Sequence, residues 1–270
     1  MTNTEQRPTA LVTGASGGIG EALAFAIAAD GYALVLVARR EGELQRVKGV
    51  VAGKHAVPVT VVALDLAQPG ACEALAKELE ARGIVPDVVV NNAGFGLVGK
   101  AVELPLGEQT ECVTLNTVAL TDLSLRYLPH MKAKGMGGIL NVASVAGFMP
   151  GPNMAVYFAT KNYVLAFTDA LAEEVKGTGV KVMSLCPGPV PTGFQDRAGM
   201  TNMRAIMGNV KSAQVIATEA WAAFKGGDRV LIPGFLNWMS AYVMRAAPRR
   251  LTLPIIGLVM ARSGRGKPSS

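Results

Sequence analysis

Two side chains that can move a proton lie four residues apart in the stretch "YFATKNYVLAFTDALAEEV", which begins at Tyr157. Its apolar spacing predicts a helix, on which Tyr157 and Lys161 share one face, one turn apart. An ammonium beside a phenol favours the phenolate, so we expect Lys161 to lower the pKa of Tyr157 and make it a usable proton donor and acceptor. A solvated pair without a chemical role is the alternative interpretation.

Two further polar residues, Ser144 and Asn116, are expected near this pair. Ser144 ends a predicted strand shortly before Tyr157, and its hydroxyl can hydrogen-bond a substrate carbonyl. Asn116 lies within a predicted helix, where a buried amide needs partners and can order a water beside the lysine. We therefore take Asn116, Ser144, Tyr157 and Lys161 as the candidate catalytic residues.

A glycine-rich turn, "TGASGGIG", runs from Thr13 to Gly20. Within it, "GASGG" fits the G-x-S-x-G turn on which hydrolases carry a nucleophilic serine. Too few residues precede Ser16 to build the upstream oxyanion loop, and neither His55 nor His130 has a recognisable catalytic setting. The turn follows a predicted strand and opens a predicted helix, which suits a pyrophosphate at the helix N-terminus. The sequence therefore favours Ser16 as part of a phosphate-binding turn.

Two arginines follow the second predicted strand. Ala38 stands where an NAD-specific site carries an acid, and Arg39 and Arg40 come next. A guanidinium pairs well with a 2′-phosphate, so these residues favour NADP(H) over NAD(H). Two solvated arginines at the start of a helix are the alternative interpretation.

The elements that must position these residues alternate along the chain. Runs of β-branched and aliphatic residues predict strands, and helical patterns stand between them. Because the runs are apolar on both faces, we expect parallel strands covered by helices on both sides. The sequence thus predicts one α/β domain with a Rossmann-like, doubly wound sheet that binds ligands at the carboxyl ends of its strands. The predicted strands span residues 9–13, 33–38, 57–64, 87–92, 138–144, 180–186 and 229–233.

Residues 8–233 together resemble the short-chain dehydrogenase/reductase family, in the type that prefers NADP(H). The resemblance rests on "TGASGGIG", Asp65 with Leu66, "NNAG" at 91–94, Asn116, Ser144, "YFATK" and "PGPVPT" at 187–192, in family order and spacing. It implies seven parallel strands in the order 3-2-1-4-5-6-7. It also implies hydride transfer between a nicotinamide and a carbonyl or carbinol carbon, coupled to a proton transfer.

The resemblance assigns a role to each catalytic candidate. Ser144 orients the carbonyl, Tyr157 transfers the proton, Lys161 lowers the pKa of Tyr157 and binds the nicotinamide ribose, and Asn116 sustains a proton relay. An NADP(H)-binding sensor on the same fold is the alternative function, although such a protein is expected to lack part of this set. The residues expected at the cofactor are Gly14, Ser16, Gly18, Ile19, Gly20, Arg39, Arg40, Asp65, Leu66, Asn92, Ala93, Gly94, Tyr157, Lys161, Pro187, Gly188, Val190 and Thr192.

Apolar residues dominate the segments expected near the substrate. The stretch 187–211 is rich in Pro, Gly and Met and predicts a flexible lid loop over the ligand crevice. This lining favours a hydrophobic ketone, aldehyde or alcohol, steroid-like or acyl-like, over a sugar phosphate, although a Met-rich loop that only packs is the alternative. The expected substrate contacts are Ser144, Phe95, Met149, Met154 and Phe194, within a wider lining of Leu97, Phe148, Met200 and Met203.

The net charge of +6 belongs to the C-terminal segment, because seven basic residues and no acid occur from Arg229 onward. The basic charge therefore does not indicate a nucleic-acid groove on the body. After a catalytic domain of residues 1–233, residues 234–270 predict an extension of two short helices separated near Pro248. Three alternatives remain for this extension: helices that pack on the body or on a sister subunit, helices that attach to a membrane surface, or an unstructured end. Neither apolar run reaches the length of a membrane span.

Other features limit the class of protein. Cys72, Cys112 and Cys186 lie far apart without a C-x-x-C pair, which predicts buried free thiols in a reducing compartment. The two histidines argue against a histidine-rich metal site. The N-terminus lacks the apolar core of a secretory signal. We therefore expect a cytoplasmic enzyme, with or without peripheral membrane contact, that forms a homodimer or homotetramer and binds a small-molecule substrate, no metal and no nucleic acid.

Overall fold

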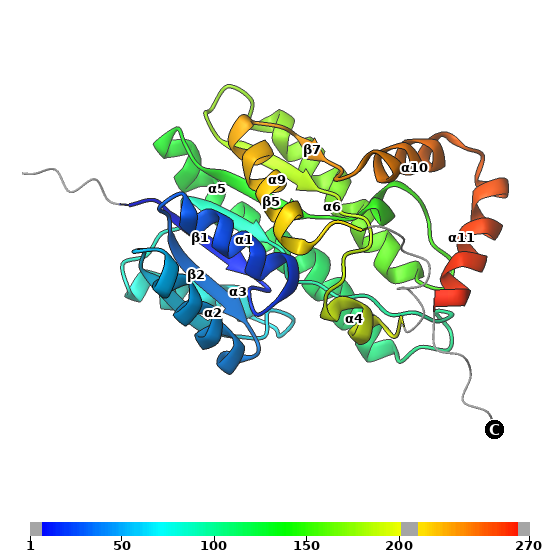
Figure 1. Ribbon diagram of the computed structural model, residues 1–270, viewed down its shortest axis with the longest axis horizontal. Helices are drawn as coiled ribbons and strands as arrows, with labels where there is room; N and C mark the ends of the chain where they lie inside the picture. The colour runs from blue at the N-terminus through cyan, green and yellow to red at the C-terminus, as the bar shows by residue number, and fades with distance from the viewer. Residues whose placement is uncertain (1–6, 201–209, 264–270) are drawn as a thin grey trace, which may run out of the picture.

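The computed structural model describes residues 7–200 and 210–263. Seven parallel strands form one sheet in the predicted order β3-β2-β1-β4-β5-β6-β7 (Figure 1). Each predicted strand is present, although several are shorter than predicted, and β7 pairs with β6 over only two residues. The strands are β1 (Thr9–Thr13), β2 (Ala33–Ala38), β3 (Val59–Ala63), β4 (Val88–Asn91), β5 (Gly138–Val142), β6 (Lys181–Leu185) and β7 (Val230–Leu231).

Helices cover both faces of the sheet (Figure 1). One face carries α1 (Gly18–Ala29), α2 (Glu41–Lys54) and α9 (Ala213–Gly226). The other face carries α3 (Ala71–Ala81), α4 (Leu106–Val113), α5 (Leu120–Lys134) and α6 (Ala155–Glu174). A π-helical turn, η1 (Thr114–Ala119), joins α4 to α5, and a 3-10 turn, η2 (Val145–Phe148), follows β5.

Alternate residues of each strand enter opposite cores. In β1, Val12 packs with the side chains of α1 and α9, whereas Leu11 packs on the α3 and α5 side. In β2, Leu36 packs with the side chains of α1 and α9, and Val37 packs on the α3 and α5 side. All four side chains are fully buried. This two-sided burial explains the continuous apolar runs in the sequence. It leaves the carboxyl ends of the strands as the edge where polar side chains can gather.

The predicted lid loop contains a helix, α7 (Gly193–Ala198). Thr192 Oγ1 accepts the N–H of Phe194 at 3.3 Å, and the side-chain oxygen of Gln195 accepts the N–H of Thr192 at 3.1 Å. This reciprocal pattern is a capping box, which starts a helix by satisfying its first donors. The segment predicted as a flexible loop is therefore helical over residues 193–198, and its role as a lid stays a prediction. Residues 201–209, including Met203, lie outside the described residues.

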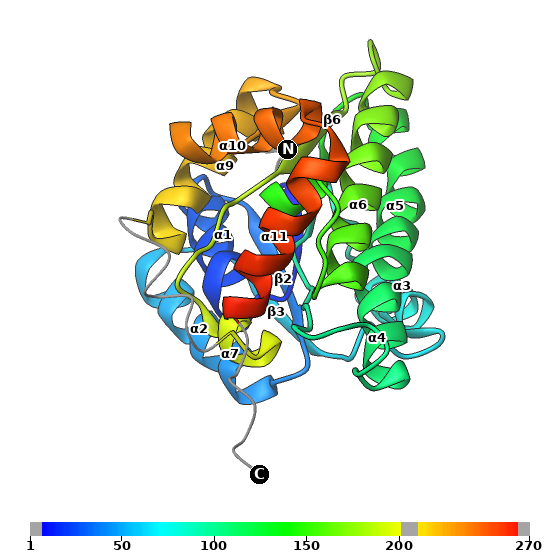
Figure 2. The same cartoon turned by 90° about the vertical axis from the view of Figure 1, so that its right-hand side faces the viewer.

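The C-terminal extension forms α10 (Phe235–Ala246) and α11 (Arg249–Ser263), with Pro248 between them as predicted. Figures 1 and 2 show both helices on one side of the molecule. In α10, Ala241 is fully buried, and the Tyr242 ring lies 5.7 Å from that of Phe148 in η2. Across residues 7–200 and 210–263, no helix combines the length and hydropathy that crossing a membrane requires. The rest of the extension, 264–270, lies outside the described residues.

Candidate functional site

Tyr157 and Lys161 lie one turn apart on α6, near the carboxyl end of β5. Lys161 is 5% exposed, and its Nζ donates a 2.7 Å hydrogen bond to the carbonyl of Val142, the last residue of β5. The same Nζ lies 5.9 Å from the centre of the Tyr157 ring. Ser144 is the second residue after β5, and its Oγ accepts the N–H of Ala146 at 3.1 Å. The end of β5 thus brings Ser144, Tyr157 and Lys161 together.

Burial shifts the pKa of both titratable residues. It raises the pKa of Tyr157 to about 12, because the phenolate is poorly solvated, and a hydrogen bond with Ser144 offsets only part of this rise. Burial also lowers the pKa of Lys161 to about 8, because the ammonium is desolvated. Lys161 therefore does not bring the pKa of Tyr157 below its ordinary value in this structure, and a lowering by its charge stays a prediction. The ammonium lies beside the ring and donates to Val142, so desolvation of the phenol dominates.

Asn116 fixes the chain that follows β4. It is buried in η1, and its Nδ2 donates to the Phe95 carbonyl at 2.9 Å and to Thr160 Oγ1 at 3.0 Å. Its Oδ1 accepts the N–H of Phe95 at 3.1 Å. A Cβ on Gly94 would lie 2.9 Å from Asn116 Oδ1 and 3.6 Å from Lys161 Nζ, so only glycine fits between them. Asn116 is therefore close to the lysine, and its role in a proton relay stays a prediction.

The glycine turn after β1 leads directly into α1. Gly14 and Gly18 have φ values of 66° and 59°, a left-handed conformation that favours glycine. A Cβ on Gly14 would lie 2.9 Å from the Ala93 Cα. Gly17 precedes α1, whose first turn receives no hydrogen bond from a capping side chain among the described residues. Uncapped amides at a helix N-terminus, bordered by a close backbone, fit a pyrophosphate.

Hydrogen bonds fasten this turn to the end of β4. Asn92 Nδ2 donates to the carbonyls of Thr13 at 2.9 Å and Gly14 at 3.2 Å. Thr13 Oγ1 accepts the N–H groups of Asn92 and Ala93, both at 3.0 Å. The turn and the "NNAG" segment are therefore one connected unit. Ser16 Oγ lies 3.3 Å from Arg40 Nη2, which donates to it, so the structure brings these two predicted residues together.

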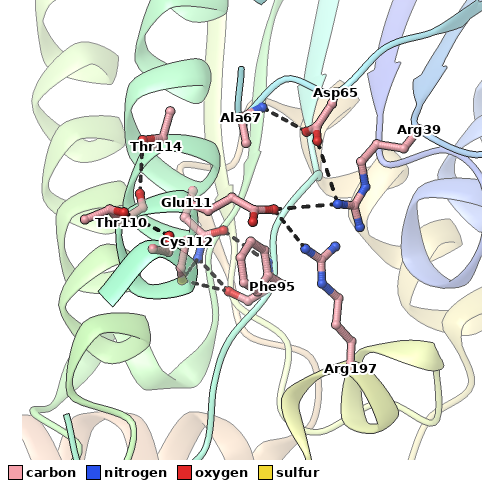
Figure 3. A network of polar contacts seen from close by, with 11 residues as sticks. Arg39, Asp65, Ala67, Phe95, Thr110, Glu111, Cys112, Thr114 and Arg197 are labelled. Carbon is pink, nitrogen blue, oxygen red and sulfur yellow. Dashed lines mark hydrogen bonds and ion pairs between the residues drawn. The ribbon is translucent and has the colours of Figure 1, made fainter. Parts of the chain in front are cut away.

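Charged side chains form a network beside the glycine turn (Figure 3). Arg39 Nη1 lies 3.8 Å from Asp65 Oδ2 and 3.6 Å from Glu111 Oε1. Arg197 Nη2, from α7, lies 3.2 Å from the same Glu111 oxygen. Burial, followed by the charge of Arg39, lowers the pKa of Arg197. The sequence analysis missed Glu111 and Arg197, because both lie outside its motifs and they meet only in the folded chain.

The structure buries Phe95, one of the residues expected to contact the substrate. Its ring is 2% exposed, packs with the α4 and α5 core, and is covered by the Arg197 guanidinium at 3.8 Å from the ring centre. The structure therefore places this predicted substrate contact beneath the charged network. The hydrogen bonds of its backbone to Asn116 hold it there.

An apolar cluster packs around the Tyr157 ring. The Phe194 ring lies 5.4 Å from it, and Met149 and Met154 belong to the same cluster, so the structure brings these three predicted contacts together. The extension also contributes, because Ile256 of α11 is buried in this cluster, and Asn153 donates to the Gly257 carbonyl at 3.0 Å. The sequence analysis missed this contribution. The members are Ala146, Met154, Phe158, Ala198, Met200 and Ile256, with Val98, Met149, Tyr157, Phe194, Met244 and Met260 partly buried.

The loop after β6 links the remaining predicted cofactor residues to the extension. The Pro187 carbonyl accepts the N–H of Val145 at 3.1 Å and the Ser144 hydroxyl at 3.4 Å. A Cβ on Gly188 would lie 2.6 Å from the side chain of Asn237 in α10, so α10 packs directly on this loop. Thr192 lies over the glycine turn, 3.0 Å from where a Gly18 Cβ would stand. Four more of the predicted cofactor residues follow β1, β3 and β6 in the chain and are buried or partly buried: Ile19, Gly20, Leu66 and Val190.

The three cysteines are buried free thiols, as predicted. Burial raises the pKa of Cys72 and Cys112 to about 11 and that of Cys186 to about 12. A thiol with so high a pKa is a poor nucleophile near neutral pH. The cysteines therefore add no nucleophile to the site.

Known proteins share this sequence pattern and arrangement. The model of a family described as short chain dehydrogenase matches residues 8–202. An NADP-dependent 3-hydroxy acid dehydrogenase of Schizosaccharomyces pombe is 35% identical over 192 residues, which cover 69% of this chain and 73% of the relative. A short-chain dehydrogenase from Sphingobium yanoikuyae in complex with NADPH has a TM-score of 0.78 and 29% identity over 97% of this chain and 98% of that chain. A structure concerned with 7beta-hydroxysteroid dehydrogenase stereoselectivity has a TM-score of 0.84 and 27% identity over 93% and 96% of the two chains.

Proposed function

Because this chain belongs to the short-chain dehydrogenase family, we propose that it transfers hydride between NADP(H) and a carbonyl or alcohol carbon of a hydrophobic substrate. The observation that carries the proposal is the meeting of Ser144, Tyr157 and Lys161 at the end of β5, beside an apolar cluster. A proton donor, a hydrogen-bonding hydroxyl and a buried cation at one point are the groups that carbonyl reduction needs.

In the proposed reduction, each of these side chains has one task. The Ser144 hydroxyl hydrogen-bonds the substrate carbonyl oxygen and orients it. The nicotinamide, when bound, supplies the hydride that adds to the carbonyl carbon. The oxygen then takes the proton of the Tyr157 hydroxyl, which yields the alcohol and a phenolate. The positive charge of Lys161 stabilises that phenolate. Tyr157 carries its proton at neutral pH, as this role requires, although burial raises its pKa and makes it a weaker acid.

NADP(H) is the proposed cofactor. The uncapped start of α1 accepts the pyrophosphate, and Arg39 and Arg40 at the end of β2 offer guanidinium groups to a 2′-phosphate. The carboxylates of Asp65 and Glu111 lie 3.8 Å and 3.6 Å from the Arg39 guanidinium, so both border the proposed phosphate site. The S. pombe relative is NADP-dependent by name and the Sphingobium structure contains NADPH, and both support the proposal.

A hydrophobic ketone or secondary alcohol is the proposed substrate class. Met149, Met154 and Phe194 surround Tyr157 with apolar surface, and the similarity to a structure concerned with a hydroxysteroid dehydrogenase supports a bulky substrate. The cavity beside Tyr157, which Leu97 also lines, has a volume of about 10 Å³. A cavity of this size is too small for a bulky substrate, so binding one requires the surrounding side chains to move. In this proposal, residues 1–233 form the catalytic domain and the extension from 234 completes the wall of its pocket.

A substrate panel tests the proposal, with NADPH oxidation followed by its absorbance. Aliphatic ketones of increasing size, a steroid ketone and a sugar phosphate would be compared with NADPH and with NADH. We expect turnover of the apolar ketones that is faster with NADPH, and no turnover of the sugar phosphate. Equal turnover of the sugar phosphate would reject the substrate class. Tight NADPH binding without turnover of any carbonyl would favour the sensor instead.

A further inference from the structure

The outward face of α11 is apolar. Leu251, Ile255 and Leu258 are 58%, 55% and 54% exposed, and Val259 continues the same stripe. The spacing of Leu251, Ile255 and Leu258 places them on one side of the helix, turned away from the buried Ile256, and Val259 lies at the edge of that side. A helix that packs one face on the body and meets water with the other carries polar residues outward. The outward stripe of α11 therefore fits a partner that is itself apolar.

The preceding helix α10 also exposes aromatic rings. Phe235 is 73% exposed, and its ring centre lies 6.1 Å from that of Trp238, which in turn lies 5.2 Å from Tyr242. Met239 is exposed beside them. Tryptophan and tyrosine combine an apolar body with a polar edge, which suits the boundary between lipid and water. We call the exposed apolar residues of both helices the extension face: Phe235, Leu236, Trp238, Met239, Tyr242, Val243, Leu251, Ile255, Leu258 and Val259.

Cations border the extension face. Arg245, Arg249 and Arg250 lie exposed where α10 passes into α11, and Arg262 lies exposed in the last turn of α11. The sequence contains no Asp or Glu from Arg229 onward. A surface of apolar and aromatic residues with arginines at its border combines hydrophobic burial with attraction to negative lipid headgroups.

We infer that the extension face docks on the surface of a bilayer that contains anionic phospholipid. In a symmetric contact between two copies through this face, the arginines at its border would meet no acid of the other extension, because the extension contains none. Anionic headgroups supply that missing charge. Docking also brings the site close to lipid, because the buried side of α11 contributes Ile256 to the cluster around Tyr157. Delivery of a substrate from the membrane rests on the proposed function, whereas docking does not.

Co-sedimentation of the full chain with vesicles tests the inference. Vesicles of phosphatidylcholine would be compared with vesicles that also contain phosphatidylserine. We expect binding to the second kind, weakened by salt. In the variants Trp238→Ser with Leu258→Ser, and Arg249→Glu with Arg250→Glu, the bound fraction should fall about tenfold or more. The matched controls are Val50→Ser with Val85→Ser, and Lys77→Glu with Lys132→Glu, which change exposed residues of the body and should bind normally.

Membrane docking and contact between two copies predict different results for these variants. Circular dichroism would confirm that each variant is folded, and turnover of a water-soluble ketone should be unchanged in the extension variants. No binding to either kind of vesicle, or equal binding by the variants and the unmodified chain, would overturn the inference. So would an oligomer that dissociates in the Trp238→Ser and Leu258→Ser variant without any vesicle binding, because the face would then be an interface between copies. Vesicle binding in the absence of any enzymatic turnover would reject the proposed function and leave docking intact.

Discussion

Lys161 Nζ lies 5.9 Å from the centre of the Tyr157 ring, and its 2.7 Å hydrogen bond goes to the carbonyl of Val142. With pKa values of about 12 for Tyr157 and about 8 for Lys161, both residues hold their protons at neutral pH. The site therefore presents a neutral acid and a buried cation. When the phenol gives up its proton, the phenolate forms beside that cation, and the pair is stabilised by their attraction.

Replacing Tyr157 with Phe should abolish turnover and spare cofactor binding. The ring stays in the apolar cluster, while the proton donor is lost, so we expect kcat to fall by roughly 100-fold to 10,000-fold. NADPH affinity, measured by fluorescence titration, should stay within about threefold of the unmodified value, since one hydrogen bond is worth little net free energy. Tyr163→Phe is the matched control, because Tyr163 lies exposed on the same helix and its hydroxyl contacts Thr121. Undiminished turnover in Tyr157→Phe would remove the residue from the mechanism.

Replacing Lys161 with Met should change how stability depends on pH. The pKa of Lys161 is about 8 in the folded chain and ordinarily 10.5, so between these values the unfolded chain binds more protons. Stability contributed by Lys161 therefore rises with pH across this window and is lowest below it. The free energy of unfolding of the unmodified chain, minus that of Lys161→Met, should increase by about 3 kcal/mol from below pH 8 to above pH 10.5. Urea unfolding at both ends of the window measures it, and a constant difference would contradict the lowered pKa.

The sheet and the catalytic set could be predicted because their signals are local. Two-sided burial makes each strand a continuous apolar run, and family spacing marks Ser144, Tyr157 and Lys161. The capping box from Thr192 to Gln195 is also local, so α7 could have been predicted from it. The contact between Glu111 and Arg197 could not, because the residues lie 86 positions apart on ordinary polar helix faces.

The pocket wall supplied by the extension was hidden for a different reason. The helix α11 exposes large apolar residues, while two of its three buried residues, Thr252 and Ser263, are polar, so periodicity does not mark Ile256 as a residue that faces inward. The pKa of Tyr157 was missed for a similar reason, since sequence spacing places Lys161 nearby without showing that its ammonium donates to Val142. Burial depth and donor direction are properties of the folded chain.

Replacing Arg39 with Ala should make the enzyme discriminate less between cofactors. A charge-assisted hydrogen bond to the 2′-phosphate is lost, so we expect the KM for NADPH to rise by roughly 10-fold to 100-fold. The KM for NADH, which lacks that phosphate, should change little. Arg82→Ala is the control, because Arg82 pairs with Glu78 on α3. An equal rise in the KM for NADPH and for NADH would mean that Arg39 does not bind the 2′-phosphate.

Replacing Glu111 with Gln should have the opposite effect on NADPH. Its carboxylate lies 3.6 Å from Arg39 and 3.2 Å from Arg197, so it competes with a phosphate for both guanidinium groups. Without that charge we expect the KM for NADPH to fall about threefold, as for the loss of a partly exposed ion pair, while the KM for NADH changes less. Glu73→Gln on α3 is the matched control. Steady-state kinetics with the two cofactors measure the change, and a higher KM for NADPH would show that Glu111 instead holds the arginines in their binding positions.

Replacing Ser16 with Ala tests whether this serine binds phosphate or attacks a substrate. Arg40 Nη2 donates to both the hydroxyl and the backbone carbonyl of Ser16 at 3.3 Å, and the variant keeps the carbonyl. We therefore expect NADPH affinity to fall only about twofold to fivefold, the value of one weak exposed hydrogen bond. At saturating NADPH, kcat should be unchanged, because the hydroxyl groups that act on the substrate in the proposed mechanism are those of Ser144 and Tyr157. Fluorescence titration measures the affinity and initial rates measure kcat. A kcat reduced to background with normal NADPH binding would indicate that Ser16 is a nucleophile. It would contradict the proposal that Ser16 acts only in binding the phosphate.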